Sequence, residues 1–184
     1  RANYYINSWK DFQKIKFIDK KKYITAIVIF ISAIIIQLYT FPGKVQYPAH
    51  VDEPSVVETA FKIYNGEFNP DFFRYPAGHM NMLALIYKTC SLFANQITME
   101  SAYKIAWYLS NVFMALIPVM VFSICTLLGT YVIGLIGCCL VMTSDILLQH
   151  SQYAIVDVSL SFFCSLFFTF SIYWFIKSNF SPNK

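Results

Sequence analysis

The chain has 184 residues, of which 57% are hydrophobic and only 13% charged, and its formal net charge is +4. A soluble domain of this length rarely combines so few charges with so many apolar side chains, so the composition excludes an ordinary soluble globular protein. It indicates a protein whose solvent is a lipid bilayer, and we expect no nucleic-acid partner.

The N-terminal segment, residues 1–22, is basic, because its lysines and one arginine outnumber two aspartates. By the positive-inside rule, this imbalance predicts that the N-terminus is cytoplasmic. Apolar residues recur at every third position from Trp9 to Ile18. This pattern fits either an amphipathic helix on the inner leaflet or a solvated basic tail.

Four apolar stretches are candidate membrane spans, since a helix needs about 20 apolar residues to cross about 30 Å of hydrocarbon. Residues 23–41, 105–128 and 158–176 meet this requirement. Residues 131–148 are counted as a span because Gly129 and Thr130 leave room only for a tight turn between antiparallel helices. The first stretch is not interpreted as a cleavable signal peptide, because its apolar run is too long and no small-x-small site follows.

Residues 80–93 form a shorter apolar stretch, about 21 Å long as a helix. Lys88 lies near its middle, where a charge inside a span costs roughly 2.5 to 3.5 kcal/mol, so we expect an interfacial helix. The alternative is a fifth, short span with Lys88 snorkelling to the surface. Four spans return Lys177 and Lys184 to the cytoplasmic side, which the positive-inside rule favours.

The predicted fold is an all-α integral membrane protein with about four transmembrane helices and interfacial helices in a long first outer or lumenal loop. We expect it in a bacterial plasma membrane or the endoplasmic reticulum membrane. The predicted order is a cytoplasmic segment (1–22), a first span (23–41), an outer or lumenal loop (42–104), a second span (105–128), a third span (131–148), an outer or lumenal loop with an acidic motif (149–157), a fourth span (158–176) and a cytoplasmic tail (177–184).

The five cysteines all lie in apolar segments, and their odd number without ligand spacing argues against a disulfide framework or a zinc site. They are interpreted as packing residues. No metal ligand is assigned, and the metal dependence stays open, with a divalent ion as the candidate cofactor.

The first loop reads HVDEPSVVETAFKIYNGEFNPDFFRYPAGH from His50 to His79. Asp52 and Glu53 precede Pro54, which suits the first turn of a helix, so both carboxylates are expected at the N-terminus of a helix over 54–64. A capping role is one interpretation, because a carboxylate there is stabilised by about 1 kcal/mol. A catalytic role is the other.

Turn signals follow this helix. Asn65-Gly66 and Asn69-Pro70 predict turns, and the Arg74-Tyr75-Pro76 step opens the interfacial helix. The loop therefore folds its acids and Arg74 back toward one membrane surface.

A second motif, HSQYAIVD, runs from His150 to Asp157 between the third and fourth predicted spans. With four spans it emerges on the same face as Asp52. Asp157 is interpreted as a cap of the last helix and Asp145 as a cap of a short interfacial turn. An acid at a span boundary is also a functional-site candidate, since it is costly in lipid.

The order of these motifs carries a resemblance to a known family. An Asp-Glu pair follows the first span, then come a short helix, a Gly-x-x-Asn-Pro turn, an aromatic-Pro step into an amphipathic helix, and Ser-x-Tyr-x-x-x-Asp before a later span. This arrangement resembles the N-terminal part of the dolichyl-phosphate-mannose protein mannosyltransferases and their bacterial relatives, membrane glycosyltransferases of the GT-C fold. It extends over residues 23–176 and is closest at 50–78 and 151–157.

The resemblance implies transfer of a sugar from a polyprenyl-phosphate carrier to a protein, glycan or lipid acceptor on the outer or lumenal side. It matches Asp52 to the family's catalytic acid, Glu53 to its acidic neighbour and Asp157 to the later acid that completes the site. A carboxylate can remove the proton of the acceptor hydroxyl as general base, an effect of typically 10² to 10⁴ in rate.

The leaving phosphate needs cations or hydrogen-bond donors, and the expected ones are Arg74, His79 and Lys88. Tyr75 precedes Pro76 where some relatives carry Lys-Pro, which leaves Arg74 as the nearest cation. The remaining site candidates are His50, Tyr75 and Tyr153.

The family has more spans than this chain offers. We therefore expect a fragment, a truncated product or one part of a split enzyme, completed by further membrane helices. The alternative from another class is a non-catalytic membrane scaffold or assembly subunit, in which the loop carboxylates are only caps.

Overall fold

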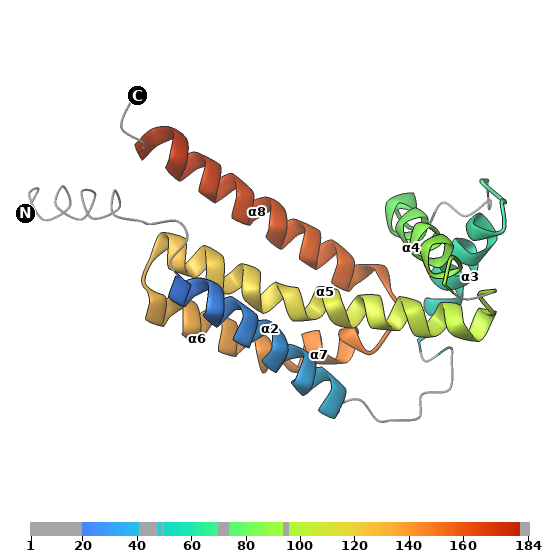
Figure 1. Ribbon diagram of the computed structural model, residues 1–184, viewed down its shortest axis with the longest axis horizontal. Helices are drawn as coiled ribbons and strands as arrows, with labels where there is room; N and C mark the ends of the chain where they lie inside the picture. The colour runs from blue at the N-terminus through green and yellow to red at the C-terminus, as the bar shows by residue number, and fades with distance from the viewer. Residues whose placement is uncertain (1–19, 41–47, 49, 70–73, 94–95, 181–184) are drawn as a thin grey trace, which may run out of the picture.

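The computed structural model describes residues 20–40, 48, 50–69, 74–93 and 96–180 (Figure 1). Its regular secondary structure within these residues is helical, which confirms the predicted all-α class. The pattern predicted for 9–18 and the end of the tail lie outside the described residues. The helices are α2 (Lys20–Thr40), α3 (Glu53–Tyr64), α4 (Ala77–Cys90), α5 (Met99–Leu128), α6 (Tyr131–Met142), α7 (Asp145–Ser151) and α8 (Val156–Phe180).

Helices α2, α5 and α8 are long and apolar enough to cross a membrane. Helices α6 and α7 join this set only as one bent pair, with 59° between them. The prediction of one continuous helix over 131–148 is therefore wrong. Thr143, Ser144 and Asp145 end the apolar run, and such residues favour helix ends because their side chains compete for backbone hydrogen bonds.

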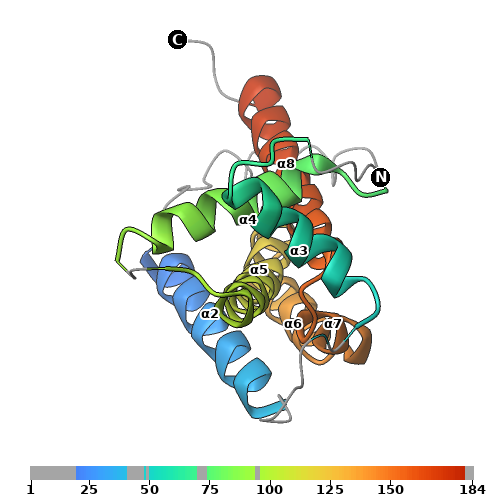
Figure 2. The ribbon, with the colours of Figure 1, turned by 90° about the vertical axis from the view of Figure 1, so that its right-hand side faces the viewer.

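Helix α5 lies at the centre of the bundle, with α2, α6 and α8 packed around it (Figure 2). Helix α6 approaches α5 closely, because an added Cβ at Gly134 would lie 2.4 Å from Cγ2 of Thr126. Helix α2 is joined to α5 by Gln37. With its amide nitrogen turned toward α5, Gln37 donates to the carbonyl and the side-chain oxygen of Asn111 at 2.8 and 2.9 Å.

Helix α8 packs against α5 over its first half and diverges from it toward the C-terminal end (Figure 1). It exposes large apolar side chains such as Phe167, Phe170 and Trp174. Exposed aromatic side chains of this kind are costly in water and favourable in lipid. All five cysteines are free; Cys138 is buried, which fits a packing role, whereas Cys139 and Cys164 are exposed, which does not.

Helices α3 and α4 of the first loop form a packed layer across one end of α5 (Figures 1 and 2). Helices α3 and α4 share a core with the start of α5, in which the hydroxyl of Tyr87 donates to the carbonyl of Ala102 at 3.1 Å. Helix α4 has 14 residues and is not among the candidate spans. The described residues thus offer three spans, or four with the bent pair, and α4 supplies no fifth.

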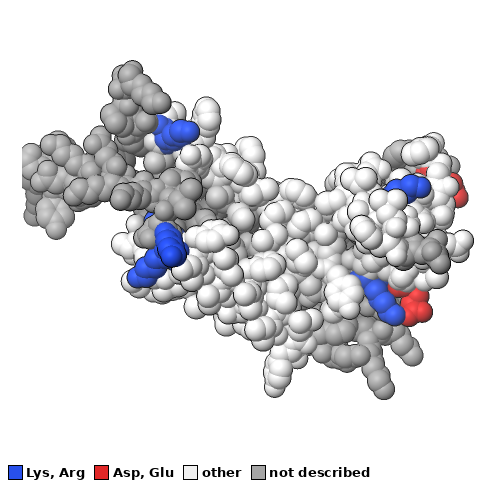
Figure 3. All heavy atoms as spheres, in the orientation of Figure 1, with Lys and Arg blue, Asp and Glu red and all other residues white. Residues whose placement is uncertain are grey.

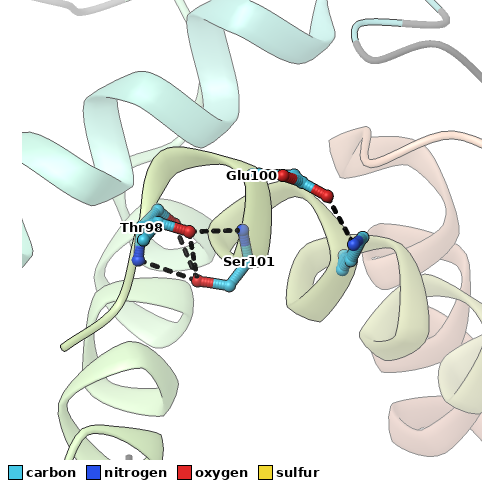
Figure 4. Close-up of polar contacts among 4 residues, drawn as sticks. Thr98, Glu100 and Ser101 are labelled. Atoms are coloured by element: carbon cyan, nitrogen blue, oxygen red, sulfur yellow. Dashed lines mark hydrogen bonds and ion pairs between the residues drawn. The ribbon is translucent and has the colours of Figure 1, made fainter. Parts of the chain in front are cut away.

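Helix α5 begins at Met99, six residues before the predicted start of the second span. The earlier start follows from a capping box, in which Thr98 and Ser101 exchange side-chain and backbone hydrogen bonds (Figure 4). Glu100 and Lys104 form an ion pair one turn apart on the same helix. Helices α3 and α4 pack against this polar first part of α5, at one end of the apolar bundle.

Charged residues gather at the two ends of the molecule (Figure 3). Lys20, Lys21 and Lys22 begin α2, and Lys177 lies near the end of α8, at the same end of the bundle. Asp and Glu side chains lie at the opposite end, with α3 and the start of α5. We call the latter the acidic end.

Candidate functional site

Three segments that are distant in the sequence meet at the acidic end. They are the start of α3, the turn between α7 and α8 (residues 152–155), and the residues that lead into α4. The turn also reaches α2, because the side-chain nitrogen of Gln152 donates to the carbonyl of Thr40 at 3.3 Å. The ends of five helices, α2, α3, α4, α7 and α8, therefore meet around the candidate site residues.

Asp52 directly precedes α3 with φ −90° and ψ −13°, and its side chain makes no capping hydrogen bond. The capping interpretation of Asp52 is therefore wrong, because an N-cap carboxylate must turn back to the free amides of the first turn. The carboxylate instead accepts a hydrogen bond from the hydroxyl of Tyr75, which raises the pKa of that phenol. At 27% side-chain exposure, Asp52 remains accessible to a substrate.

His50 lies beside Asp52 and beside the turn. Its Nδ1 accepts a hydrogen bond from the backbone N–H of Asp52 at 3.2 Å and lies 3.8 Å from Oδ2 of the same residue. Its ring packs against Tyr153, with 5.0 Å between the ring centroids. His50 thus links the first loop to the second motif.

Asp157 lies in the first turn of α8 and is exposed. Its Oδ2 is 3.7 Å from Nδ1 of His150. The negative charges of Asp52 and Asp157 both raise the pKa of Tyr75, after the hydrogen bond to Asp52 and partial burial, so the two acids act on one phenol. The structure therefore places both acids, which the sequence separates by about a hundred residues, within electrostatic range of Tyr75.

Glu53 differs sharply from its neighbour, since its side chain is fully buried. One carboxylate oxygen accepts from the backbone N–H of Ala154 at 2.7 Å, and the other accepts from the backbone N–H of His50 at 3.2 Å. A carboxylate enclosed in this way has no open path to an acceptor hydroxyl. Its environment does not fit the catalytic role expected for Glu53.

The three predicted cations are in different places. Arg74 is exposed, and its Cζ lies 5.7 Å from the ring centroid of Tyr75, so it belongs to the site. His79 is buried, which lowers its pKa to about 4, so it is neutral near pH 7 and offers no positive charge to a phosphate. Lys88 is exposed in the last turn of α4, about 16 Å along the axis from the end that Arg74 precedes.

His150 was missed as a site residue by sequence reasoning. It opens the second motif and lies seven positions before Asp157, which is two turns of a continuous helix. The chain between them is not continuous helix but the turn at 152–155. The sequence therefore contains no spacing signal from which this contact could be read.

The site combines two accessible carboxylates, two imidazoles, a phenol and a guanidinium at the edge of an apolar bundle. Carboxylates and imidazoles can accept a proton or bind sugar hydroxyls, and a guanidinium can bind an anionic group. The described residues contain no group of three or more His, Cys, Asp or Glu arranged to hold a metal ion.

Comparisons of the chain with protein-family models, with curated proteins and with solved structures found no match.

Proposed function

We propose that this chain is a membrane glycosyltransferase, or part of one, that uses a polyprenyl-phosphate-linked sugar and acts on the outer or lumenal face. One observation carries the proposal. Asp52 is an accessible carboxylate that does not cap its helix, is held by Tyr75, and shares the acidic end of an apolar bundle with Asp157. A carboxylate that served only as a cap would be turned toward the helix.

In the proposed reaction, Asp52 removes the proton from the acceptor hydroxyl as its oxygen forms a bond to the anomeric carbon. The bond from that carbon to the phosphate oxygen breaks, and its electron pair leaves with the polyprenyl phosphate. The hydroxyl of Tyr75 holds the carboxylate in place, and its raised pKa keeps it protonated as a donor. A general base of this kind contributes typically 10² to 10⁴ in rate.

Arg74 supplies the binding group for the leaving phosphate in this proposal. Its guanidinium is next to Tyr75, which bonds Asp52, so a phosphate bound there would lie close to the base. Asp157 lies beside His150 and suits hydrogen bonding to sugar hydroxyls. We also propose a cytoplasmic N-terminus, which is supported by the lysines at the start of α2 and near the end of α8, at the end opposite the acids.

The test replaces Asp52 with Asn, which keeps the size and an acceptor oxygen but removes the basicity. We expect transfer from a panel of radiolabelled polyprenyl-phosphate sugars, measured in membranes from cells that express the gene, to fall about 10²-fold or more. Binding of the donor and thermal stability should stay close to wild type. The matched control is Asp145→Asn, which changes an exposed aspartate in the first turn of α7.

Near-normal transfer by Asp52→Asn would contradict the assignment of Asp52 as base. Absence of transfer by wild-type protein from every donor in the panel would favour the scaffold alternative. In that case the Asp52→Asn variant should still assemble with any partner subunits as wild type does.

A further inference from the structure

The turn between α7 and α8 depends on a side chain from another part of the molecule. The backbone N–H of Ala154 is buried and donates to Oε1 of Glu53 at 2.7 Å, across 101 residues of sequence. This distance is short for a bond from an amide to a carboxylate oxygen and is typical of a charge-assisted hydrogen bond. A buried backbone N–H without such an acceptor is strongly unfavourable, so the turn needs Glu53 in this place.

The other oxygen of Glu53 binds within its own loop. Oε2 accepts from the backbone N–H of His50 at 3.2 Å, just before α3. One carboxylate therefore joins two backbone segments, one on each side of the site. The core beneath it includes Ala154 and Val156 from the turn and α8, and Val56 and Val57 from α3. These contacts leave the side chain of Glu53 no exposure to solvent.

The two accessible acids are attached directly to these two segments. Asp52 is the residue before Glu53, and Asp157 follows Ala154 by three positions, in the first turn of α8. Consecutive Cα atoms are about 3.8 Å apart, so neither acid can move far without the backbone that Glu53 holds. The separation of Asp52 and Asp157 is thus set through Glu53.

We infer that Glu53 is a positioning residue, a clamp that holds the 152–155 turn against the start of α3 and so fixes Asp157 relative to Asp52. The clamp itself depends only on the geometry of the chain. Its consequence for sugar transfer rests on the proposed function.

The clamp requires a carboxylate of this length. Gln has one acceptor oxygen, and its amide nitrogen would face a backbone N–H, so at least one of the two bonds must break. Asp lacks one methylene group and cannot reach both N–H groups from the same backbone position. Leu leaves both N–H groups without the acceptor.

The test is hydrogen–deuterium exchange of the whole chain in detergent micelles or nanodiscs. In wild type, the amides of residues 152–156 should exchange slowly despite lying in a turn between helices. In Glu53→Gln their exchange should accelerate about tenfold or more, while α5 and α6 keep wild-type protection. The matched control is Glu58→Gln, which changes an exposed glutamate on the same helix and should leave residues 152–156 unaffected.

Fast exchange of residues 152–156 in wild type would overturn the inference without any variant. So would unchanged exchange in Glu53→Gln, or loss of protection throughout the bundle in both Glu53→Gln and Glu53→Asp, because Glu53 would then serve folding as a whole. Local acceleration in Glu53→Gln alone supports the clamp even if no sugar transfer is found, which separates its failure from that of the proposed function.

If transfer is found, its kinetics give a second measurement. Glu53→Gln should lower kcat about tenfold or more while KM for the lipid donor changes little, since Arg74 lies outside the clamped segments. A variant that was merely less folded would lower the apparent enzyme concentration, and its hydrogen exchange would rise throughout the chain rather than at residues 152–156. Wild-type kcat in Glu53→Gln with accelerated exchange at 152–156 would overturn the catalytic consequence of the clamp.

Discussion

Ionisable residues that are close together in the first loop differ in their exposure to solvent. Asp52 and Arg74 reach the surface, whereas Glu53 and His79 are enclosed. The enclosed pair has different surroundings, because Glu53 accepts two backbone hydrogen bonds and Nδ1 of His79 has no hydrogen-bond partner among the described residues. A buried imidazole without such a partner is favourable only in its neutral form.

His79 should therefore make the stability of the protein depend on pH. Its folded pKa of about 4 lies below the unfolded value of 6.5, so unfolding takes up a proton between these values, and stability is lost as the pH falls through this window. At pH 5 the loss relative to pH 7 should be about 2 kcal/mol. Thermal unfolding of the detergent-solubilised chain at both pH values measures it.

His79→Met removes the titrating group and should flatten this part of the pH dependence. His150→Gln is the control, because His150 lies beside Asp157 near the surface and is not enclosed. Identical pH dependence in His79→Met and wild type would contradict the lowered pKa of His79 in the folded state.

At the scale of the helices, close contact between α5 and α6 depends on two glycines of α6, which have no side chain. Gly134 and Gly137 face α5, and an added Cβ at either position would contact Phe122, Thr126, Val121 or Cys125. Helices in lipid associate by such close packing, because the apolar solvent provides little hydrophobic driving force between them. The tight turn after Leu128 completes the hairpin, with the side chain of Thr130 accepting from the backbone N–H of Ile133 at 3.3 Å.

Gly134→Ala should destabilise the chain by about 1–3 kcal/mol, the typical cost of overpacking, because its Cβ would lie 2.4 Å from Thr126 and 3.1 Å from the carbonyl oxygen of Phe122. Gly78→Ala is the matched control within α4. No atom lies within 4 Å of its Cβ position, so alanine should stabilise that helix by up to about 1 kcal/mol. The measurement is the melting temperature of both variants in the same detergent, which should fall for Gly134→Ala and stay equal or rise for Gly78→Ala. Equal shifts in the two variants would mean that α5 and α6 are not in close contact.

At the scale of the whole molecule, the charges define two ends. Lysines mark the end where α2 begins and α8 finishes, whereas the end where α3 and α4 lie carries the acids together with some lysine and arginine side chains (Figure 3). An apolar bundle with charged ends is oriented across a bilayer by the excess of cytoplasmic lysine and arginine. In the proposed function, this orientation puts the candidate site on the outer or lumenal face, with the α6–α7 pair as a fourth span.

Single cysteines in a cysteine-free background test this arrangement. Cysteines at Lys62 and Gln149, both exposed at the acidic end, should react with an impermeant thiol reagent added outside, and one at Lys20 should not. Gln149 is used rather than Ser151 in the same segment, because Ser151 is buried and a cysteine there would not reach the reagent. Opposite labelling of positions 62 and 149 would mean that the α6–α7 pair does not cross the membrane and that Asp52 and Asp157 lie on different sides.

The sequence by itself determined the features that depend on neighbours along the chain. Composition and apolar runs predicted the helical class and the long helices, since lipid accepts only helices or closed barrels as spans. Pro54 predicted a helix over 54–64, and α3 runs from Glu53 to Tyr64. Asp52, Tyr75, Tyr153 and Asp157 were named as candidates from local motifs, and the structure brings them to one end.

Only the tertiary structure decided which of these residues are accessible. Asp52 and Glu53 are adjacent and chemically alike, yet Asp52 is partly exposed and Glu53 is enclosed, because Glu53 accepts a hydrogen bond from the backbone N–H of Ala154, about a hundred residues away. His79 is buried beside the core of α3, α4 and α5, whereas Arg74 is exposed. The turn after α7 brings His150 next to Asp157. Burial and long-range hydrogen bonds arise from contacts between distant segments, and local propensity and hydropathy contain no information about those contacts.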